Sequence, residues 1–420
     1  MNSINVLNEG YSSAFNEVDF HCTNADGSKI FDEDNNAYID LSMGGGCCLL
    51  GHQPPFITTA ITQQLMRGSI YTIPNKLTYQ CAENLHAMMP WYSDFVFCST
   101  GSEATLRALR IARAYNKKSK VAMFSGSWHG SHDFLLYEED YDNESNEPSL
   151  KRKSSGMLDS LDEHVVLLPY NDPYAFEILD KFKTELSLVI IEPVQGSNPQ
   201  SKIDEFLNQL REFCTHNKIL LCFDEVITGA RLALGGAQEY FNIKADLATY
   251  GKSIGGGLPL GIVAGTPEVM STIKSTHSPV FMGGTFSANP LSMAACLATT
   301  SYLINNKYCY LELEQSSNYL RSSINEFCIN HSIKAKLIGI GSFNRLIFTD
   351  VSIRSRKERD LLELEWSEQA DFFSHLRRLG VYIGSNRIIY LSTAHSVNDI
   401  DKVILAFETA LSLYHSKGFI

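Results

Sequence analysis

Seven short apolar segments separated by helical patterns constrain the fold of this 420-residue chain more than any other feature. Short apolar runs between turn residues are typical of strands buried on both faces of a mostly parallel sheet. Clear helical patterns lie between several of them, at 103–115 and 205–216. This alternation predicts an α/β fold with right-handed crossovers. The seven predicted strands are 95–98, 121–124, 165–168, 188–191, 220–223, 247–249 and 262–264.

The two ends of the chain have a different pattern, and 420 residues exceed the usual size of one core. Turn signals at 26–27 and 34–36 predict β-hairpins within residues 20–42, and amphipathic helices with short strands begin near residue 301. We therefore expect an N-terminal segment (1–52) that contributes to a small domain and to the active site. A large domain (53–300) and a C-terminal small domain (301–420) follow it.

Composition narrows the classes of partner. The chain has 35 Lys and Arg against 47 Asp and Glu, a formal charge of −12 that argues against nucleic-acid binding. We find neither a secretory signal nor an apolar run long enough to span a membrane. The ten cysteines show no Cys-x-x-Cys spacing. Reduced thiols, a cytoplasmic location and no zinc site are expected.

Asp224 and Lys252 are a carboxylate and an amine at the ends of two predicted strands. Such a pair suits pyridoxal phosphate: the lysine would form the Schiff base, and the aspartate would keep the pyridine nitrogen protonated. The sequence Gly251-Lys252-Ser253 also resembles part of a phosphate-binding P-loop, but that motif needs a glycine where this chain has Asp246. We therefore predict the cofactor lysine rather than a nucleotide site.

Other polar and aromatic residues follow strands at the edge where α/β sheets bind ligands. Thr100 and Glu103 have the spacing of a capping box. Gly101 and Ser102 begin this helix, whose free N–H groups could hold a phosphate, although a well-capped helix is the simpler alternative. Trp128 could stack on a planar ring, yet most tryptophans are core residues. His129 and His132 lack a third metal ligand at a convincing spacing. The remaining candidates at the predicted cofactor site are Glu192, Val226 and Thr285, each of which could also be an ordinary strand-end or turn residue.

Together these segments resemble the class III, fold-type-I pyridoxal-phosphate aminotransferases, and within them the members similar to glutamate-1-semialdehyde 2,1-aminomutase. The resemblance covers nearly the whole chain. The similar segments are 34–40, 50–52, 100–104, 128–130, 169–172, 192–194, 224–229, 234–238, 251–259, 284–290 and 391–395.

The resemblance implies a role for each candidate residue. Lys252 would form the Schiff base and Asp224 would pair with the pyridinium. Gly101 and Ser102 would bind the phosphate, with His129 and Glu192 beside the cofactor. Trp128 and Val226 would pack on opposite faces of the ring. Thr285 would reach the cofactor of a neighbouring subunit, which makes a homodimer the expected unit. Residues 137–156 lie where the aminomutases carry a gating loop.

The chain also departs from that subgroup. The stretch 9–16 has no arginine where the aminomutases bind the substrate carboxylate, and Gly45 stands where they carry a tryptophan. The segment 382–387 lacks their Phe-Glu signature. Arg231 and Arg387 are candidates to replace the carboxylate clamp. These differences predict a roomier pocket that suits a less anionic substrate.

The expected activity is therefore an intermolecular aminotransferase that uses small-molecule amine and carbonyl substrates. Glutamate-1-semialdehyde 2,1-aminomutase, an intramolecular isomerase, is the main alternative. A racemase on the same scaffold comes third. A non-catalytic cofactor-binding protein comes fourth, and the presence of Lys252 argues against it.

Overall fold

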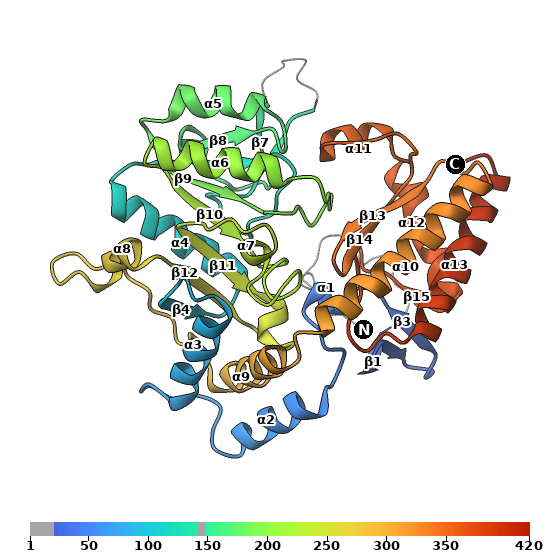
Figure 1. Cartoon of the computed structure of the whole chain (residues 1–420), viewed down its shortest axis with the longest axis horizontal. Coiled ribbons are helices and arrows are strands. Elements are labelled where there is room, and N and C mark those ends of the chain that lie inside the picture. The colour runs from blue at the N-terminus through green and yellow to red at the C-terminus, as the bar shows by residue number, and fades with distance from the viewer. Residues whose placement is uncertain (1–20, 142–147) are drawn as a thin grey trace, which may run out of the picture.

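A seven-stranded sheet forms the centre of the computed structural model, which describes residues 21–141 and 148–420 (Figure 1). The strand order is β4-β12-β11-β10-β9-β5-β8, and β12 alone among the seven runs antiparallel to both of its neighbours. All seven strands predicted from the sequence are present, and the mostly parallel α/β fold is confirmed. The strands are β4 (Asp94–Cys98), β5 (Lys120–Phe124), β8 (Val165–Leu168), β9 (Leu186–Ile191), β10 (Leu220–Asp224), β11 (Leu247–Gly251) and β12 (Gly261–Gly265).

Both faces of this sheet are buried, as the continuous apolar runs predicted. Alternate residues of β5 belong to two separate clusters of buried side chains: Val121 and Met123 to one, Ala122 and Phe124 to the other. The first cluster includes the apolar side of α4 (Gly101–Asn116). The second includes residues of α5 (Tyr174–Phe182) and α6 (Asp204–His216). Helices therefore cover the sheet on both sides, which leaves its strand ends as the accessible polar edge.

Segments from the two chain ends pair with each other. The strands β1 (Cys22–Asp26), β2 (Lys29–Asp32) and β3 (Ala37–Asp40) form the predicted hairpins, and β3 pairs in parallel with β15 (Val381–Tyr382). A three-stranded sheet of β13 (Lys336–Ile340), β14 (Phe343–Ile347) and β16 (Ile389–Tyr390) lies nearby. The long helices α10 (Cys309–Asn330), α12 (Trp366–Arg378) and α13 (Val397–Ser416) lie beside these strands on the right of Figure 1.

The remaining elements connect or border these units. A small antiparallel hairpin, β6 (Tyr137–Glu139) and β7 (Leu150–Arg152), follows β5 within the predicted gating loop, whose residues 142–147 lie outside the described residues. None of the helices in the described ranges is both long and apolar enough to cross a bilayer. The other helices and turns are α1 (Met43–Gly46), α2 (Pro55–Leu65), α3 (Lys76–Met88), α7 (Ala237–Tyr240), α8 (Pro267–Met270), α9 (Pro290–Asn305), α11 (Arg356–Leu362), η2 (Asp159–His164), η3 (Lys252–Gly255) and η4 (Ser271–Lys274).

Candidate active site

Asp224 is the last residue of β10, where three hydrogen bonds hold its carboxylate. One oxygen accepts from Thr249 Oγ1 at 2.9 Å and from the Val226 backbone N–H at 3.2 Å. The other lies 2.7 Å from His129 Nδ1. Asp224 is 5 % exposed and Thr249 and His129 are fully interior. A buried carboxylate needs such hydrogen-bond partners.

The loop after β5 brings Trp128 and His129 to the same edge. His129 is buried against Asp224, and its Nε2 atom has no hydrogen-bond partner among the described residues. The backbone N–H of Trp128 donates to Glu192 Oε1 at 2.9 Å, while its side chain is 53 % exposed. Burial raises the pKa of Glu192, nearby His129 lowers it, and Asp224 raises it further.

Lys252 begins η3 directly after β11, with a positive φ of 40°. Burial lowers its pKa, and Cys47, Glu192 and Asp224 partly oppose that shift. A lysine whose charged form is destabilised has more of its neutral, nucleophilic amine at ordinary pH. Residues of the glycine-rich turn α1 also lie here, because Ser253 Oγ donates to the Gly46 carbonyl at 3.2 Å.

The start of α4 completes this edge. Thr100 Oγ1 accepts from the Glu103 N–H at 3.1 Å and so caps the helix as predicted, while Glu103 Oε2 accepts from the N–H of Ser99. A Cβ atom on Gly101 would lie 3.3 Å from both methyl groups of Val226. Ser102 Oγ accepts from the Ser131 N–H at 3.1 Å, next to Trp128. The absence of a side chain at Gly101 therefore lets Val226 pack closely against the positive end of the helix.

The structure brings eight of the nine candidate residues to one edge of the sheet. These are Gly101, Ser102, Trp128, His129, Glu192, Asp224, Val226 and Lys252. Thr285 is exposed in the segment before α9, and within residues 21–141 and 148–420 no hydrogen bond or ion pair joins it to the other eight. Two neighbours of the site were missed from the sequence. Thr249 could have been found from the parallel register of β10 and β11, which pairs it with Asp224. Cys47 could not, because it is far from Lys252 along the chain and comes near it only in the folded protein.

The two arginines that were candidates to bind the substrate carboxylate are buried in the interior of the protein. Arg231 donates through Nη1 to Ser342 Oγ (2.9 Å) and the Leu391 carbonyl (3.1 Å), and through Nη2 to the Gly46 carbonyl (2.7 Å). Burial lowers the pKa of Arg231 to about 10. Arg387 is also buried, and its Nη1 donates to Gln369 Oε1 at 2.5 Å. Both guanidinium groups thus stabilise the chain fold. The stretch 9–16, where the aminomutases carry the arginine, lies outside the described residues.

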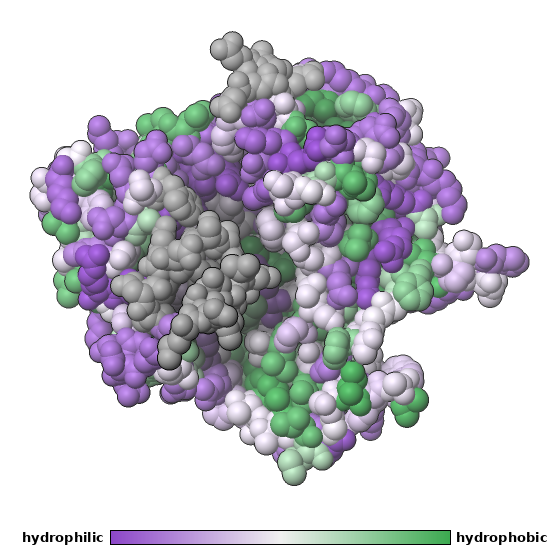
Figure 2. Space-filling view, turned by 180° about the vertical axis from the view of Figure 1, so that it is seen from behind, coloured by the Kyte–Doolittle hydropathy of each residue, from purple (hydrophilic) through white to green (hydrophobic). Residues whose placement is uncertain are grey.

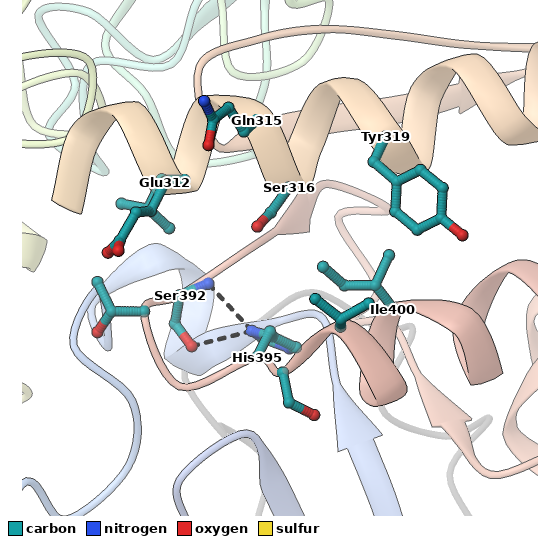
Figure 3. A pocket seen from close by; sticks show the side chains of 11 residues that line it. Glu312, Gln315, Ser316, Tyr319, Ser392, His395 and Ile400 are labelled. Carbon is teal, nitrogen blue, oxygen red and sulfur yellow. Dashed lines mark hydrogen bonds between the residues drawn. The ribbon is translucent and has the colours of Figure 1, made fainter. Parts of the chain in front are cut away.

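A cavity of about 510 Å³ lies elsewhere, between α10 and the segment that precedes α13 (Figure 3). Ser392 donates to His395 Nδ1 through both its backbone N–H (3.0 Å) and its hydroxyl (2.9 Å). Burial lowers the pKa of His395, which favours the neutral imidazole, and this side chain lines the cavity. None of the nine candidate residues lines it.

The donor set at the sheet edge fits pyridoxal phosphate. The α4 N-terminus suits a phosphate, the anchored Asp224 carboxylate suits a protonated ring nitrogen, and the Lys252 amine suits an aldehyde. The unpartnered Nε2 of the buried His129 is consistent with a ligand at this edge.

Comparison with known proteins points to one family. A family model described as aminotransferase class-III matches residues 11–411. The glutamate-1-semialdehyde 2,1-aminomutase of Methanosarcina acetivorans is 35 % identical over 393 residues, covering 92 % of this chain and 91 % of that protein.

Solved structures agree. An omega-transaminase from Sphaerobacter thermophilus has a TM-score of 0.87 and 29 % identity, covering 94 % of this chain and 91 % of the other. A transaminase with bound pyridoxal phosphate has a TM-score of 0.83 and 26 % identity, covering 95 % and 92 %. The family model spans nearly the whole chain, and the relatives reported above cover 92–95 % of it. The chain therefore belongs to the class-III aminotransferase family.

Proposed function

We propose that this class-III enzyme is an intermolecular aminotransferase in which Lys252 and Asp224 carry the chemistry. Pyridoxal phosphate is the cofactor of the family, and when bound it withdraws electrons from the carbon that bears the substrate amine. The observation that carries the proposal is the pair itself: a lysine with a lowered pKa beside a carboxylate held by three donors.

Each residue then has a specific task. The Lys252 amine would hold the cofactor covalently and, once free, would take a proton from the substrate carbon and return it on the far side of the nitrogen, a 1,3-shift. Asp224 would keep a proton on the ring nitrogen, and Thr249 and His129 would hold its carboxylate in place. Gly101 and Ser102 would bind the phosphate at the α4 N-terminus. Such preorganised charge is commonly a large part of catalysis.

The substrate side of the site favours transfer of the amino group between two substrates over its internal shift within one substrate. Arg231 and Arg387 are committed to interior partners, so neither supplies a carboxylate clamp. Gly45 adds no side chain at the position of the aminomutase tryptophan. The omega-transaminase likeness supports this assignment. The identity to the Methanosarcina acetivorans aminomutase keeps the internal shift as the second candidate.

A single-turnover experiment separates the two activities. The purified holoenzyme is mixed with one amino donor at a time while the absorbance of the bound cofactor is recorded and products are identified by mass. An aminotransferase releases one carbonyl product per site and stops until an acceptor is added. If the enzyme instead turns over glutamate-1-semialdehyde to an isomeric amine without a released co-product, the proposal is wrong and the mutase assignment replaces it.

A homodimer is part of the same proposal. Large apolar side chains are exposed on α2, on the segment that follows it and on the segment before α9; Figure 2 shows hydrophobic residues gathered at the lower edge, on the side where α2 lies in Figure 1. The most exposed are Leu65, Met66, Ile73, Phe281 and Phe286. Such a patch is typical of an interface, and Thr285 beside Phe286 would reach the partner's cofactor. The domain division at 52 and 300 is also proposed, supported by the pairing of β3 with β15.

Light scattering of the holoenzyme tests the dimer. We expect twice the 46.9 kDa chain mass, and we expect Met66→Glu with Phe281→Glu to shift the protein toward the monomer with weaker cofactor binding. Thr285→Ala should weaken cofactor binding while the dimer mass stays unchanged. A monomeric parent protein that binds pyridoxal phosphate fully would refute the shared site.

A further inference from the structure

The β6–β7 hairpin contacts the loop that carries Trp128. Lys153 follows β7, and its Nζ atom lies 5.2 Å from the centroid of the Trp128 ring. Cations within about 6 Å of an indole ring are attracted to its face. The backbone of Trp128 is tied to Glu192, whereas its ring is half exposed and lacks the close packing that fixes a core tryptophan. Lys153 is thus a contact that restrains the ring itself.

Glu139 fastens the hairpin to the same loop. Its carboxylate accepts from Ser125 Oγ at 2.6 Å and pairs with Lys357 Nζ at 2.7 Å. Ser125 belongs to the loop that leads from β5 to Trp128, and Lys357 lies on α11 from the C-terminal part of the chain. The Glu139 side chain is 6 % exposed and that of Lys357 is 34 % exposed, so the carboxylate is the buried member of this ion pair. Loss of Lys357 would leave the buried Glu139 carboxylate without its counter-charge, which favours the paired geometry.

The same junction has close backbone packing. A Cβ atom on Gly126 would lie 3.0 Å from Arg356 Cβ, and Ser197 Oγ donates to the Gly126 carbonyl at 2.9 Å. The loop 125–128 therefore contacts the β6–β7 hairpin, α11 and the segment after β9. Its freedom to move depends on elements that are distant in the sequence.

We propose that Lys153 is a positioning residue that holds the Trp128 indole in the orientation in which it packs on the cofactor ring, with Glu139 and Lys357 fixing the hairpin that carries it. The inference rests on the proposed function, because it assumes that Trp128 faces the cofactor. It adds that a loop of the large sheet and a helix of the C-terminal part jointly set the cofactor affinity.

The effect should be modest and specific to the charge. An exposed cation–π contact contributes about 0.5–1 kcal/mol, which corresponds to about a 2- to 5-fold change in a dissociation constant. We expect Lys153→Met to raise the dissociation constant of pyridoxal phosphate by that factor, and Lys153→Arg to restore the parent value. Lys151→Met, on the exposed side of the same hairpin, is the matched control and should leave it unchanged.

Two readouts keep the test independent of catalysis. The dissociation constant is measured by titrating apoenzyme with pyridoxal phosphate, and acrylamide quenching of tryptophan fluorescence is measured in the apoenzyme. We expect Lys153→Met to increase quenching in the parent but not in a Trp128→Leu background. A double-mutant cycle on the dissociation constant should show that Lys153→Met has no further effect once Trp128 is Leu.

The outcomes separate the two assumptions. If Trp128→Leu leaves the dissociation constant unchanged, Trp128 does not face the cofactor and the assignment of that residue in the proposed function fails. If Trp128→Leu weakens binding but Lys153→Met adds its own effect in full, or tightens binding, the positioning role is refuted. Lys357→Met should reproduce the Lys153→Met effect, while Arg354→Met, at an exposed residue just before α11 that pairs with Glu358, should not.

Discussion

At Asp224 one carboxylate takes hydrogen bonds from a strand, a turn and a distant loop. Thr249 lies on β11, Val226 follows β10, and His129 comes from the loop after β5. A single free donor would leave the carboxylate able to rotate. Three donors in different elements fix the position of the carboxylate, as a preorganised partner for a pyridinium requires.

Replacing Asp224 tests how much a negative charge at this position contributes to kcat. We expect Asp224→Asn to lower kcat about 10²- to 10³-fold, because the neutral amide no longer keeps the ring nitrogen protonated. Thr249→Val removes one donor of three and should cost about 5- to 10-fold, as expected for one hydrogen bond of about 1 kcal/mol. Steady-state kinetics of both variants check this order; equal losses would mean that the effect is structural rather than electrostatic.

Lys252 is the second residue whose loss should be severe. We expect Lys252→Ala to lower kcat by about 10⁴-fold or more, because the nucleophile and the proton-transfer group are both removed. Mass spectrometry after borohydride reduction should show one covalently attached cofactor in the parent and none in the variant. A Lys252→Ala enzyme with full activity would disprove the assignment.

Among the elements, α4 illustrates how much a local pattern can predict. Thr100 and Glu103 in the sequence predicted the cap, and the Thr100 Oγ1 bond to the Glu103 N–H confirms it. The strands were equally predictable, because each is apolar on both faces. The sequence pattern did not show that β12 runs antiparallel or that β15 pairs with β3, since both depend on where the chain returns.

The cap of α4 offers a prediction at this scale. We expect Thr100→Ala to cost about 1 kcal/mol and to lower the Tm by about 1–3 °C. Because the same helix end is the proposed phosphate site, the dissociation constant of pyridoxal phosphate should rise as well. Asn75→Ala, which removes the N-cap bond of α3 to Thr78, is the control. It should lower the Tm similarly and leave cofactor affinity unchanged.

At the scale of the molecule, the N-terminal strands reach the site through the segment between Asp40 and His52. His52 Nε2 lies 2.8 Å from Asp40 Oδ2, and the His52 backbone pairs with that of Gly27. Burial alone would lower the pKa of His52, but hydrogen bonds to Asp40 and Cys48 raise it from 6.5 to about 10. The segment that contacts Lys252 is therefore tied to β3 by a charged histidine.

This ion pair makes stability depend on pH. A raised histidine pKa means that the folded state binds the proton more tightly, so its stabilisation is complete below pH 6.5 and is lost as the pH rises toward 10. We expect His52→Gln to be less stable than the parent by about 1–2 kcal/mol at pH 6, with the two Tm values converging near pH 10. Thermal melts of both proteins across pH 5–10 measure this. A Tm difference that grows with pH would contradict the assigned pair.

The sequence by itself determined the mostly parallel sheet, the capped α4 helix and the position of Asp224 and Lys252 at the ends of two strands. These depend on local patterns: apolar runs, turn residues and chemistry at strand ends. Only the tertiary structure decided the hydrogen bonds between His129 and Asp224, between Ser253 and Gly46, and between the buried Arg231 and Gly46. Those contacts join residues 95 to 207 positions apart. No local pattern encodes them, because they arise only when separate elements pack around one core.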